Sequence, residues 1–578
     1  MAIRCPLIVL VLGAVCWTSL WGQTYTISTY AGNGISGYLG DGSTIAGAEF
    51  SSPEAVAIDA SGNIYIADTG NNRVRKIDTS GNLTTYAGDG TAGYLGDTAA
   101  ATAAELNKPS GLALDSSGNL YIADSANHVI RMVNTAGIIS TFAGNGTGGY
   151  QGDNGLATGA ELNLPTSVAL DSAGNVYIAD SKNGRIRKVA AGNIITLLGS
   201  GATSGILINP VSVVVDSAGN FYIADNGNKS ILKYGAAALT TLAGDGNPGF
   251  GGDNGPSTLA ELNNPAGVAV DSSGNLYIAD SNNSRIRRIS PGGTITTIAG
   301  NGSFNYNGDG GPATSAALNF PHGVTVDSAG RIYVADSNNH AIRLLQPVFP
   351  VISSGGVSNA ASYAPQISPG ALASVFGVNF AQSALGASVP FPTVLGGVSV
   401  TVNGRQAPIM YVTPQQVNFQ VPWETGTGTA TVAVSVNGGA GQSVTVPVTT
   451  AGPGIFQYGA GQAVAANSDS TLNGPGNPAA AGSTIVVYMT GSGPVDNPVA
   501  TGAVTPTPPA GPLSQVTSSF SATIGSATAQ VSFLGLAPGF LGVVQANVVV
   551  PSGLASGNYP LIVTINGENS NPATISVK

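Results

Sequence analysis

Cysteine and charge are both scarce in this sequence. The 578 residues include two cysteines, Cys5 and Cys16, which both lie within the first 22 residues. A chain without that segment has no disulfide, thiol nucleophile or thiolate metal site. Only 8% of residues are charged, the formal net charge is −10, and no basic stripe exists. This composition excludes nucleic acid as a partner.

Residues 1–22 have the pattern of a secretory signal peptide. Arg4 precedes an apolar run from Leu7 to Val15, and Gly22 precedes a cleavage site at Gln23. A buried strand, a membrane anchor or a lipoprotein anchored at Cys16 are alternatives, but the run is short and Val15 is the wrong neighbour for lipidation. No later stretch has about 18 uninterrupted apolar residues, so no transmembrane helix is expected. We expect an exported protein in an extracellular, cell-surface or periplasmic location.

A ten-residue element recurs six times in the first 346 residues. It reads Asp-Ser-Ser-Gly-Asn-Leu-Tyr-Ile-Ala-Asp at 271–280, and near-copies begin at Asp59, Asp115, Asp171, Asp216 and Asp327. The starts are 56, 56, 45, 55 and 56 residues apart, which is typical of a repeat architecture. Each copy predicts a hairpin with a tight Asp/Ser/Gly turn between two apolar strands.

Each period contains four predicted strands. In the fifth copy, strand a is 266–270, b is 276–279, c is 285–289 and d is 294–299. Four antiparallel strands repeated around a ring form the blades of a β-propeller. The sixth copy lacks strand d, whereas residues 26–34 match 294–302 at seven of nine positions. We therefore expect residues 23–346 to form a six-bladed β-propeller that is closed by the N-terminal strand, which removes open sheet edges.

The copies resemble NHL repeats. The motif that gives the family its name stands at Asn127-His128-Val129-Ile130-Arg131 and Asn339-His340-Ala341-Ile342-Arg343, and long inserts before strand a resemble the bacterial and teneurin-type branch. The resemblance implies a propeller. It implies little about chemistry, because such propellers serve adhesion, ligand sensing and, in a few relatives, lyase or lactonase reactions.

One face of the propeller is the candidate binding face. Strands alternate in direction, so the inserts, which connect strand d to the next strand a, share a face with the b-to-c turns. Five inserts carry an aromatic residue followed by an aspartate, and His322 precedes a strand a on the same face. The candidate ligand-binding residues are Tyr38, Asp41, Tyr94, Asp97, Tyr150, Asp153, Phe250, Asp253, Tyr306, Asp309 and His322.

These residues have two interpretations. The aromatic rings can stack sugars or anchor a protein. Alternatively, each ring packs its own insert onto the neighbouring blade and each aspartate caps a helical turn in an Ala-rich stretch such as 101–107. The fourth insert, 199–210, is about 11 residues shorter and lacks the pair. That gap is either an entrance or a lost insert.

The sequence offers little for catalysis. Its three histidines are His128, His322 and His340, of which His128 and His340 occupy one repeat position and suggest a structural role. Hydrolase, phosphate-loop and regular calcium-loop motifs are lacking, so we expect no catalytic residue, metal or cofactor. The recurring Asp at the end of strand b and Arg in strand c, such as Asp280 and Arg287, predict a structural lock in each blade, either from Asp to backbone or from Asp to Arg.

The last 230 residues predict further β structure. Residues 347–356 are rich in Pro, Gly and Ser and read as a linker. Short alternating strands follow in a duplicated pattern, since Asn418-Phe419-Gln420-Val421-Pro422 is similar to Asn547-Val548-Val549-Val550-Pro551. We expect two immunoglobulin-like sandwiches, 357–452 and 453–578. The first is similar to IPT/TIG domains, and the segment resembles a C-terminal module of exported bacterial proteins.

The sequence thus predicts an all-β, exported, non-catalytic scaffold that binds a protein or polysaccharide at the cell surface. The alternatives are a propeller enzyme of lyase or lactonase type, with its site at the central channel, and a structural envelope protein.

Overall fold

The computed structural model describes residues 24–578 except 43, 201–205, 237, 382, 437–438 and 509–510. The expected signal peptide lies outside the described residues. The chain divides into two compact units, one of which is Thr24–Val348, while the other contains Phe349–Lys578. Regular structure in the described part consists of strands and three-residue 3-10 helices, and no helix there is long and apolar enough to span a membrane.

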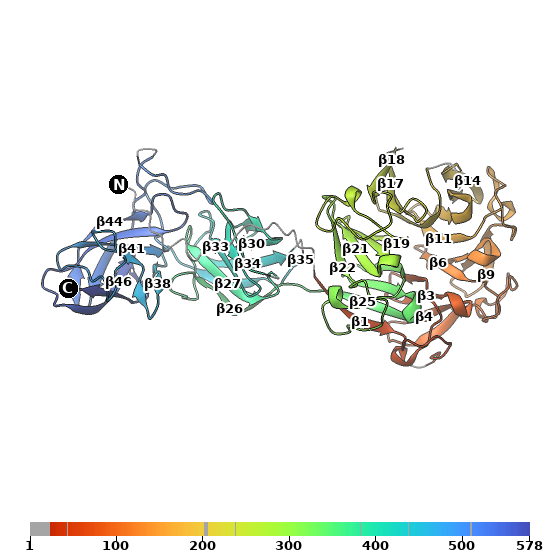
Figure 1. Ribbon diagram of the computed structural model, residues 1–578, viewed down its shortest axis with the longest axis horizontal. Coiled ribbons are helices and arrows are strands. Elements are labelled where there is room, and N and C mark those ends of the chain that lie inside the picture. Colours follow the sequence, from red (N-terminus) through yellow and green to blue (C-terminus); the bar gives the residue numbers. More distant parts are fainter. Residues whose placement is uncertain are drawn as a thin grey trace. The chain divides into compact units, whose positions relative to one another are not determined.

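Six antiparallel sheets make up the described part of Thr24–Val348, arranged around a common centre (Figure 1). The first five sheets follow the chain: β2 (Ala55–Ile58), β3 (Ile64–Asp68), β4 (Arg73–Ile77), β5 (Leu83–Ala87); β6 (Pro109–Leu114), β7 (Leu120–Asp124), β8 (Val129–Val133), β9 (Ile139–Ala143); β11 (Pro165–Leu170), β12 (Val176–Asp180), β13 (Arg185–Ala190), β14 (Asn193–Leu198), edged by β10 (Gly155–Leu156); β15 (Pro210–Val215), β16 (Phe221–Asp225), β17 (Ser230–Gly235), β18 (Ala238–Ala243); β19 (Pro265–Val270), β20 (Leu276–Asp280), β21 (Arg285–Ile289), β22 (Ile295–Ala299).

The sixth sheet joins the two ends of this unit. It contains β23 (Pro321–Val326), β24 (Ile332–Asp336), β25 (Ala341–Pro347) and β1 (Tyr25–Ala31). β1 pairs antiparallel with β25, with Ile27 opposite Leu345 (Figure 1). The first strand of each sheet lies beside the first strand of the next, and β23 lies beside β2. The all-β, propeller-type prediction is confirmed.

Burial explains why the same residues recur. Strand b is buried along its whole length in all six sheets, as in Leu276–Asp280. Because each sheet is covered by its neighbours, the apolar residues on both faces are removed from water. Ile27 of β1 is 1% exposed and packs with the last two sheets.

Two kinds of short 3-10 helix connect the strands on the candidate binding face. The inserts contain η2 (Ile45–Gly47), η4 (Ala101–Ala103), η6 (Ala157–Gly159), η8 (Ser257–Leu259) and η10 (Ala313–Ser315). The b-to-c turns contain η3 (Thr69–Asn71), η5 (Ser125–Asn127), η7 (Ser181–Asn183), η9 (Ser281–Asn283) and η11 (Ser337–Asn339). The single helical turn expected near Ala101 is confirmed.

The described part of the second unit contains two large apolar cores, each between two sheets, and a smaller apolar cluster that includes Leu372, Tyr488 and Leu541. The first pair of sheets comprises β26 (Val351–Asn359), β27 (Leu372–Val378), β33 (Gln416–Gln420), β32 (Ile409–Val412) and β28 (Leu385–Gly386), and β29 (Val394–Leu395), β30 (Val398–Val402), β31 (Arg405–Gln406), β34 (Gly428–Val436), β35 (Gly439–Ala440) and β36 (Val444–Val448). The second pair comprises β37 (Gly454–Ile455), β40 (Ala465–Ala466), β41 (Thr484–Thr490), β44 (Val531–Leu536) and β45 (Val544–Val549), and β38 (Gln457–Tyr458), β39 (Gln462–Ala463), β42 (Phe520–Ile524), β43 (Ala527–Ala529), β46 (Gly557–Ile565), β47 (Glu568–Asn569) and β48 (Ala573–Val577).

The expected linker 347–356 needs a correction. Pro347 ends β25, and residues 351–356 belong to β26, so only 348–350 lie outside strands. The Gly and Ser residues that suggested a linker occur where the pairing of β26 with β27 shifts register, between Ile352 and Val357. Glycine is common at such bulges, because the chain bends there.

Candidate functional site

A buried arginine organises each of five repeats. In the first, the guanidinium of Arg75 lies 2.6 Å from Asp41 of the insert and 3.4 Å from Asp68 at the end of β3. Arg75 and Asp68 are fully buried, whereas the Asp41 side chain is 35% exposed. The predicted lock between strands b and c is confirmed, and it extends to the insert. The other four networks are Arg131 with Asp97 and Asp124, Arg187 with Asp153 and Asp180, Arg287 with Asp253 and Asp280, and Arg343 with Asp309 and Asp336.

The insert aromatics lie on these arginines. The Tyr38 ring centroid is 4.6 Å from Arg75 and 3.9 Å from Arg73, and its hydroxyl donates to Asp41 at 2.8 Å. In the sixth repeat, Tyr306 hydrogen-bonds Thr29 of β1 at 2.7 Å. The rings keep an exposed edge, from 37% for Tyr38 to 41% for Phe250. The packing interpretation therefore describes their observed contacts, and the exposed edges are what remains for a ligand.

The predicted capping role of the insert aspartates is wrong. The residues before the five insert helices are Thr44, Ala100, Leu156, Pro256 and Pro312, and none makes a side-chain cap. The aspartates instead accept bonds from the arginines and from strand-d threonines, such as Thr85 to Asp41 at 2.6 Å. Partial burial opposes ionisation of Asp41, but hydrogen bonds from Thr85, Tyr38 and Arg75 outweigh it and lower its pKa.

The fourth repeat shows that insert and arginine form one unit. Its insert is short, and Leu232 stands in β17 where the other repeats have the arginine. Asp225 there accepts from the backbone N–H groups of Ile208 and Asn209 at 3.0 and 2.9 Å. The loss of the Tyr/Asp pair and the loss of the arginine thus occur together.

A second interlock connects three of the repeats to the next one. The Nδ1 atoms of His128 and His340 accept the backbone N–H groups of Leu164 and Ser52, each at 3.1 Å. Asn72 accepts from Lys108 N–H in the same way at 3.1 Å. The structural role expected for His128 and His340 is confirmed, and the His340 contact joins the sixth sheet to the first.

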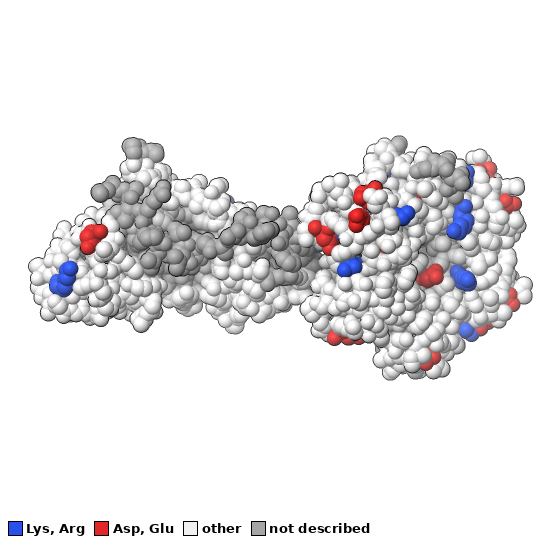
Figure 2. Space-filling model, in the orientation of Figure 1, with Lys and Arg blue, Asp and Glu red and all other residues white. Residues whose placement is uncertain are grey.

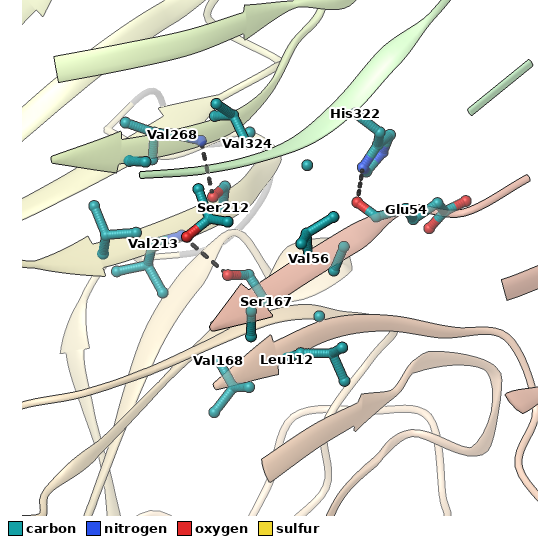
Figure 3. Close-up of a pocket in the computed structure, with 18 of the residues that line it drawn as sticks. Glu54, Val56, Leu112, Ser167, Val168, Ser212, Val213, Val268, His322 and Val324 are labelled. Carbon is teal, nitrogen blue, oxygen red and sulfur yellow. Dashed lines mark hydrogen bonds between the residues drawn. The ribbon is translucent and has the colours of Figure 1, made fainter. Parts of the chain in front are cut away.

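His322 lies in the central channel and not among the inserts. The first strands of all six sheets line a cavity of about 300 Å³. His322 Nδ1 lies 3.3 Å from the backbone oxygen of Glu54, and Ser167 and Ser212 each accept a backbone N–H from the next sheet (Figure 3). At the insert-side end, one residue per repeat follows the proline that opens the strand: Glu54, Ser110, Thr166, Val211, Ala266 and His322.

A cavity of about 240 Å³ opens beside this channel mouth. Its lining includes Glu54, Lys108, Leu164, Thr166 and Lys182. Within the described ranges, the carboxylate of Glu54 and the ammonium groups of Lys108 and Lys182 have no hydrogen bond or ion pair. Figure 2 shows how sparse charge is on the face in view, where charged side chains form isolated patches on a neutral surface. This mouth cavity therefore brings together three charged side chains that form no ion pair within the described residues.

Sequence reasoning missed Glu54, Lys108 and Lys182. The sequence does single them out, because each stands at a repeat position that varies from copy to copy, next to positions that hardly vary. The positions equivalent to Lys182, for example, read Gly70, Ala126, Gly227, Asn282 and Asn338. Among the residues that the structure describes, no group of three His, Cys, Asp or Glu side chains is placed to hold a metal ion.

Comparison with protein families identifies the repeats. The NHL repeat model matches residues 50–77, 162–189, 207–234, 262–289 and 318–343, and the teneurin NHL domain model matches 90–150. All of these stretches lie in Thr24–Val348. The expected NHL β-propeller is thus supported from sequence families as well as from the sheet arrangement.

Individual relatives are distant. The chain is 31% identical over 268 residues to Protein SUPPRESSOR OF QUENCHING 1, chloroplastic, of Arabidopsis thaliana, which covers 42% of this chain and 25% of that protein. It is 28% identical over 338 residues to NHL repeat-containing protein 2 of Bos taurus, covering 53% and 41%. The chain therefore spans less than half the length of either relative. A solved auxiliary nutrient binding protein from Bacteroides thetaiotaomicron is 14% identical, with a TM-score of 0.42 over 56% of this chain and 77% of that one. A score of this size carries no inference about ligands.

Proposed function

We propose that this chain is an exported, non-catalytic binding protein. Its six sheets would act as the blades of a propeller closed by β1, followed by two immunoglobulin-like sandwiches, the first of IPT/TIG type. The ligand is a protein or polysaccharide at the cell surface. It binds the propeller face that carries the inserts, with the mouth cavity at its centre.

The observation that supports this proposal is the division of polar groups on that face. The aspartates of the inserts form ion pairs with the buried arginines of strand c, so these charges serve the fold. Glu54, Lys108 and Lys182 line one cavity and have no such partners within the described residues. Charged groups that converge on a concave surface without stabilising the fold are typical of a binding site. The exposed edges of Tyr94 and Tyr150 extend the same face.

A propeller enzyme is the second candidate, because His322 and Glu54 come from adjacent strands at the channel mouth. One observation weighs against it: the Nδ1 atom of His322 faces a backbone carbonyl, which occupies that nitrogen in one hydrogen bond. A purely structural envelope protein is the third candidate, and it gives no reason for the unpartnered charges at the mouth.

The test is a binding screen with the full mature chain, against a glycan array and a display library of peptides. The double variant Glu54→Gln plus Lys182→Ala should weaken binding at least about tenfold, since each lost charge contact is equivalent to about 1–2 kcal/mol, while Tm is unchanged. Binding that is unaffected would move the site away from the mouth. Turnover of a selected ligand would favour the enzyme, and a screen without any binder would favour the structural protein.

A further inference from the structure

Six equivalent residues surround the channel mouth, each directly before the proline that opens an innermost strand. These rim residues are Ser52, Lys108, Leu164, Asn209, Asn264 and Phe320. Five of them have a left-handed backbone, with φ of 47°, 55°, 49°, 59° and 51° at Ser52, Lys108, Leu164, Asn264 and Phe320 respectively. The rim is therefore built from a conformation that most residues avoid.

The residue types at the rim do not all suit that backbone. In the left-handed region the Cβ of any residue except glycine crowds the following carbonyl oxygen, and asparagine tolerates this better than most residues because its short polar side chain hydrogen-bonds locally. A following proline adds a further restriction towards extended backbone. Asn264 shows that asparagine meets the requirements of the fold at this position. Lys108, Leu164 and Phe320 are strained choices, and local strain of this kind occurs mostly where function requires it.

The rest of the structure holds these residues in place. The N–H groups of Lys108 and Leu164 donate to Asn72 and His128 of the preceding repeat at 3.1 Å. The b-to-c turn thus fixes the direction in which the side chains of Lys108 and Leu164 leave the backbone. Lys108 and Leu164 both line the mouth cavity.

Phe320 lacks this support. The equivalent residue in the preceding turn is Ser284, which is fully buried and whose hydroxyl has no partner within the described residues. Phe320 is nevertheless 38% exposed and lies next to Phe304, which is 55% exposed, with ring centroids 5.8 Å apart. Two neighbouring aromatic side chains are therefore exposed at the rim, and one of them, Phe320, stands two residues before His322.

We propose that Lys108, Leu164 and Phe320 are the specificity-determining residues for a peptide segment of a protein partner. This rests on the proposed binding function of the same face. An acidic side chain or C-terminal carboxylate of the peptide binds Lys108, and its apolar side chains bind Leu164 and the Phe304–Phe320 pair. A peptide fits better than a neutral saccharide, because its acidic groups pair with the Lys108 ammonium and its apolar side chains pack on Leu164 and the two rings, whereas a neutral sugar has no charge to pair with Lys108.

The test replaces the strained residues by the one that the fold prefers. The triple variant Lys108→Asn, Leu164→Asn, Phe320→Asn is compared with Ser52→Asn, a change at an equivalent rim position with a small side chain. Both are made in the full mature chain and measured by calorimetry and by binding to peptides selected on the wild type from a random display library. A glycan array with neutral and uronic-acid sugars is run in parallel.

We expect the triple variant to raise Tm by about 2–5 °C, because three strained side chains are relieved, and to lose at least tenfold in peptide affinity. Ser52→Asn should leave affinity unchanged. Unchanged affinity in the triple variant, or a lowered Tm, would overturn the assignment. A wild type that binds uronic-acid glycans and no peptide would overturn the ligand class. A wild type that binds neither would overturn the proposed function itself.

Discussion

The substitution Arg187→Leu tests the arginine network most sharply, because it introduces the residue that the fourth repeat carries naturally. The guanidinium lies 3.1 Å from Asp180 and 2.7 Å from Asp153, and Arg187 and Asp180 are fully buried. Removing it leaves Asp180 buried without its cation. Breaking a buried pair in this way costs about 3–5 kcal/mol.

This cost converts into a measurable change in Tm. The entropy of unfolding is about 2.1 cal/mol/K per residue, which gives about 0.7 kcal/mol/K for a unit of the size of Thr24–Val348. Calorimetry of the full mature chain should therefore show Tm lowered by about 4–7 °C. Adding Asp180→Asn to the variant should restore part of the loss, because the stranded carboxylate is replaced by a neutral amide.

The matched control is the surface ion pair Arg331–Asp327. Its two charged groups lie 2.6 Å apart, and the arginine side chain is 48% exposed. Arg331→Leu should lower Tm by about 1 °C or less, since surface pairs contribute about 0–1 kcal/mol. Equal shifts for Arg187→Leu and Arg331→Leu would refute the reasoning, because the insert would then not depend on its arginine.

Three further predictions concern the ring and its locks. Burial lowers the pKa of His340 below 6.5, so its contribution to stability is present above pH 6.5 and is lost as the pH falls through the folded-state pKa. The decrease in Tm between pH 7 and pH 5 should be smaller in His340→Asn, and equal slopes would contradict the contact with Ser52. Deleting residues 23–34 removes Tyr25 and Ile27, now 3% and 1% exposed, and uncovers the edge of β25 and the apolar residues packed on them. The loss should cost at least about 5 kcal/mol, and a truncated chain that melts like the full one would exclude closure by β1. Asp280→Ala leaves Arg287 with Asp253 as the carboxylate that pairs with it and should cost about 2–4 kcal/mol, measured by urea unfolding, whereas an unchanged midpoint would refute a lock in that sheet.

Repetition made the fold predictable. Strand b and the Asp/Ser/Gly turn recur six times, so the local pattern predicted a repeat architecture. The additional copy of strand d at residues 26–34 predicted that β1 pairs with β25. The candidate site was less predictable, because side-chain pairing across 34 residues cannot be read from local pattern. Asp41 resembled an exposed ligand until Arg75 was seen to hold it.

The residues that vary between repeats carried the missing information. Lys108 and Phe320 stand at the repeat position that asparagine occupies in another copy, at Asn264. Only the positive φ angle in the structure reveals that a lysine or phenylalanine is strained there. In the C-terminal unit, the composition of 347–356 favoured a linker, and pairing with β27 overrode it. Local propensity is weak wherever a neighbouring strand supplies hydrogen bonds.

Hydrogen exchange of the full mature chain, with and without the peptide that a display library yields, tests the binding face most directly. We expect slower exchange on binding in the segments around Glu54, Lys108, Leu164, Lys182 and Phe320, with exchange in the strands of the six sheets unchanged. Protection confined to the second unit, Phe349–Lys578, or spread over the insert tips without the mouth, would contradict it.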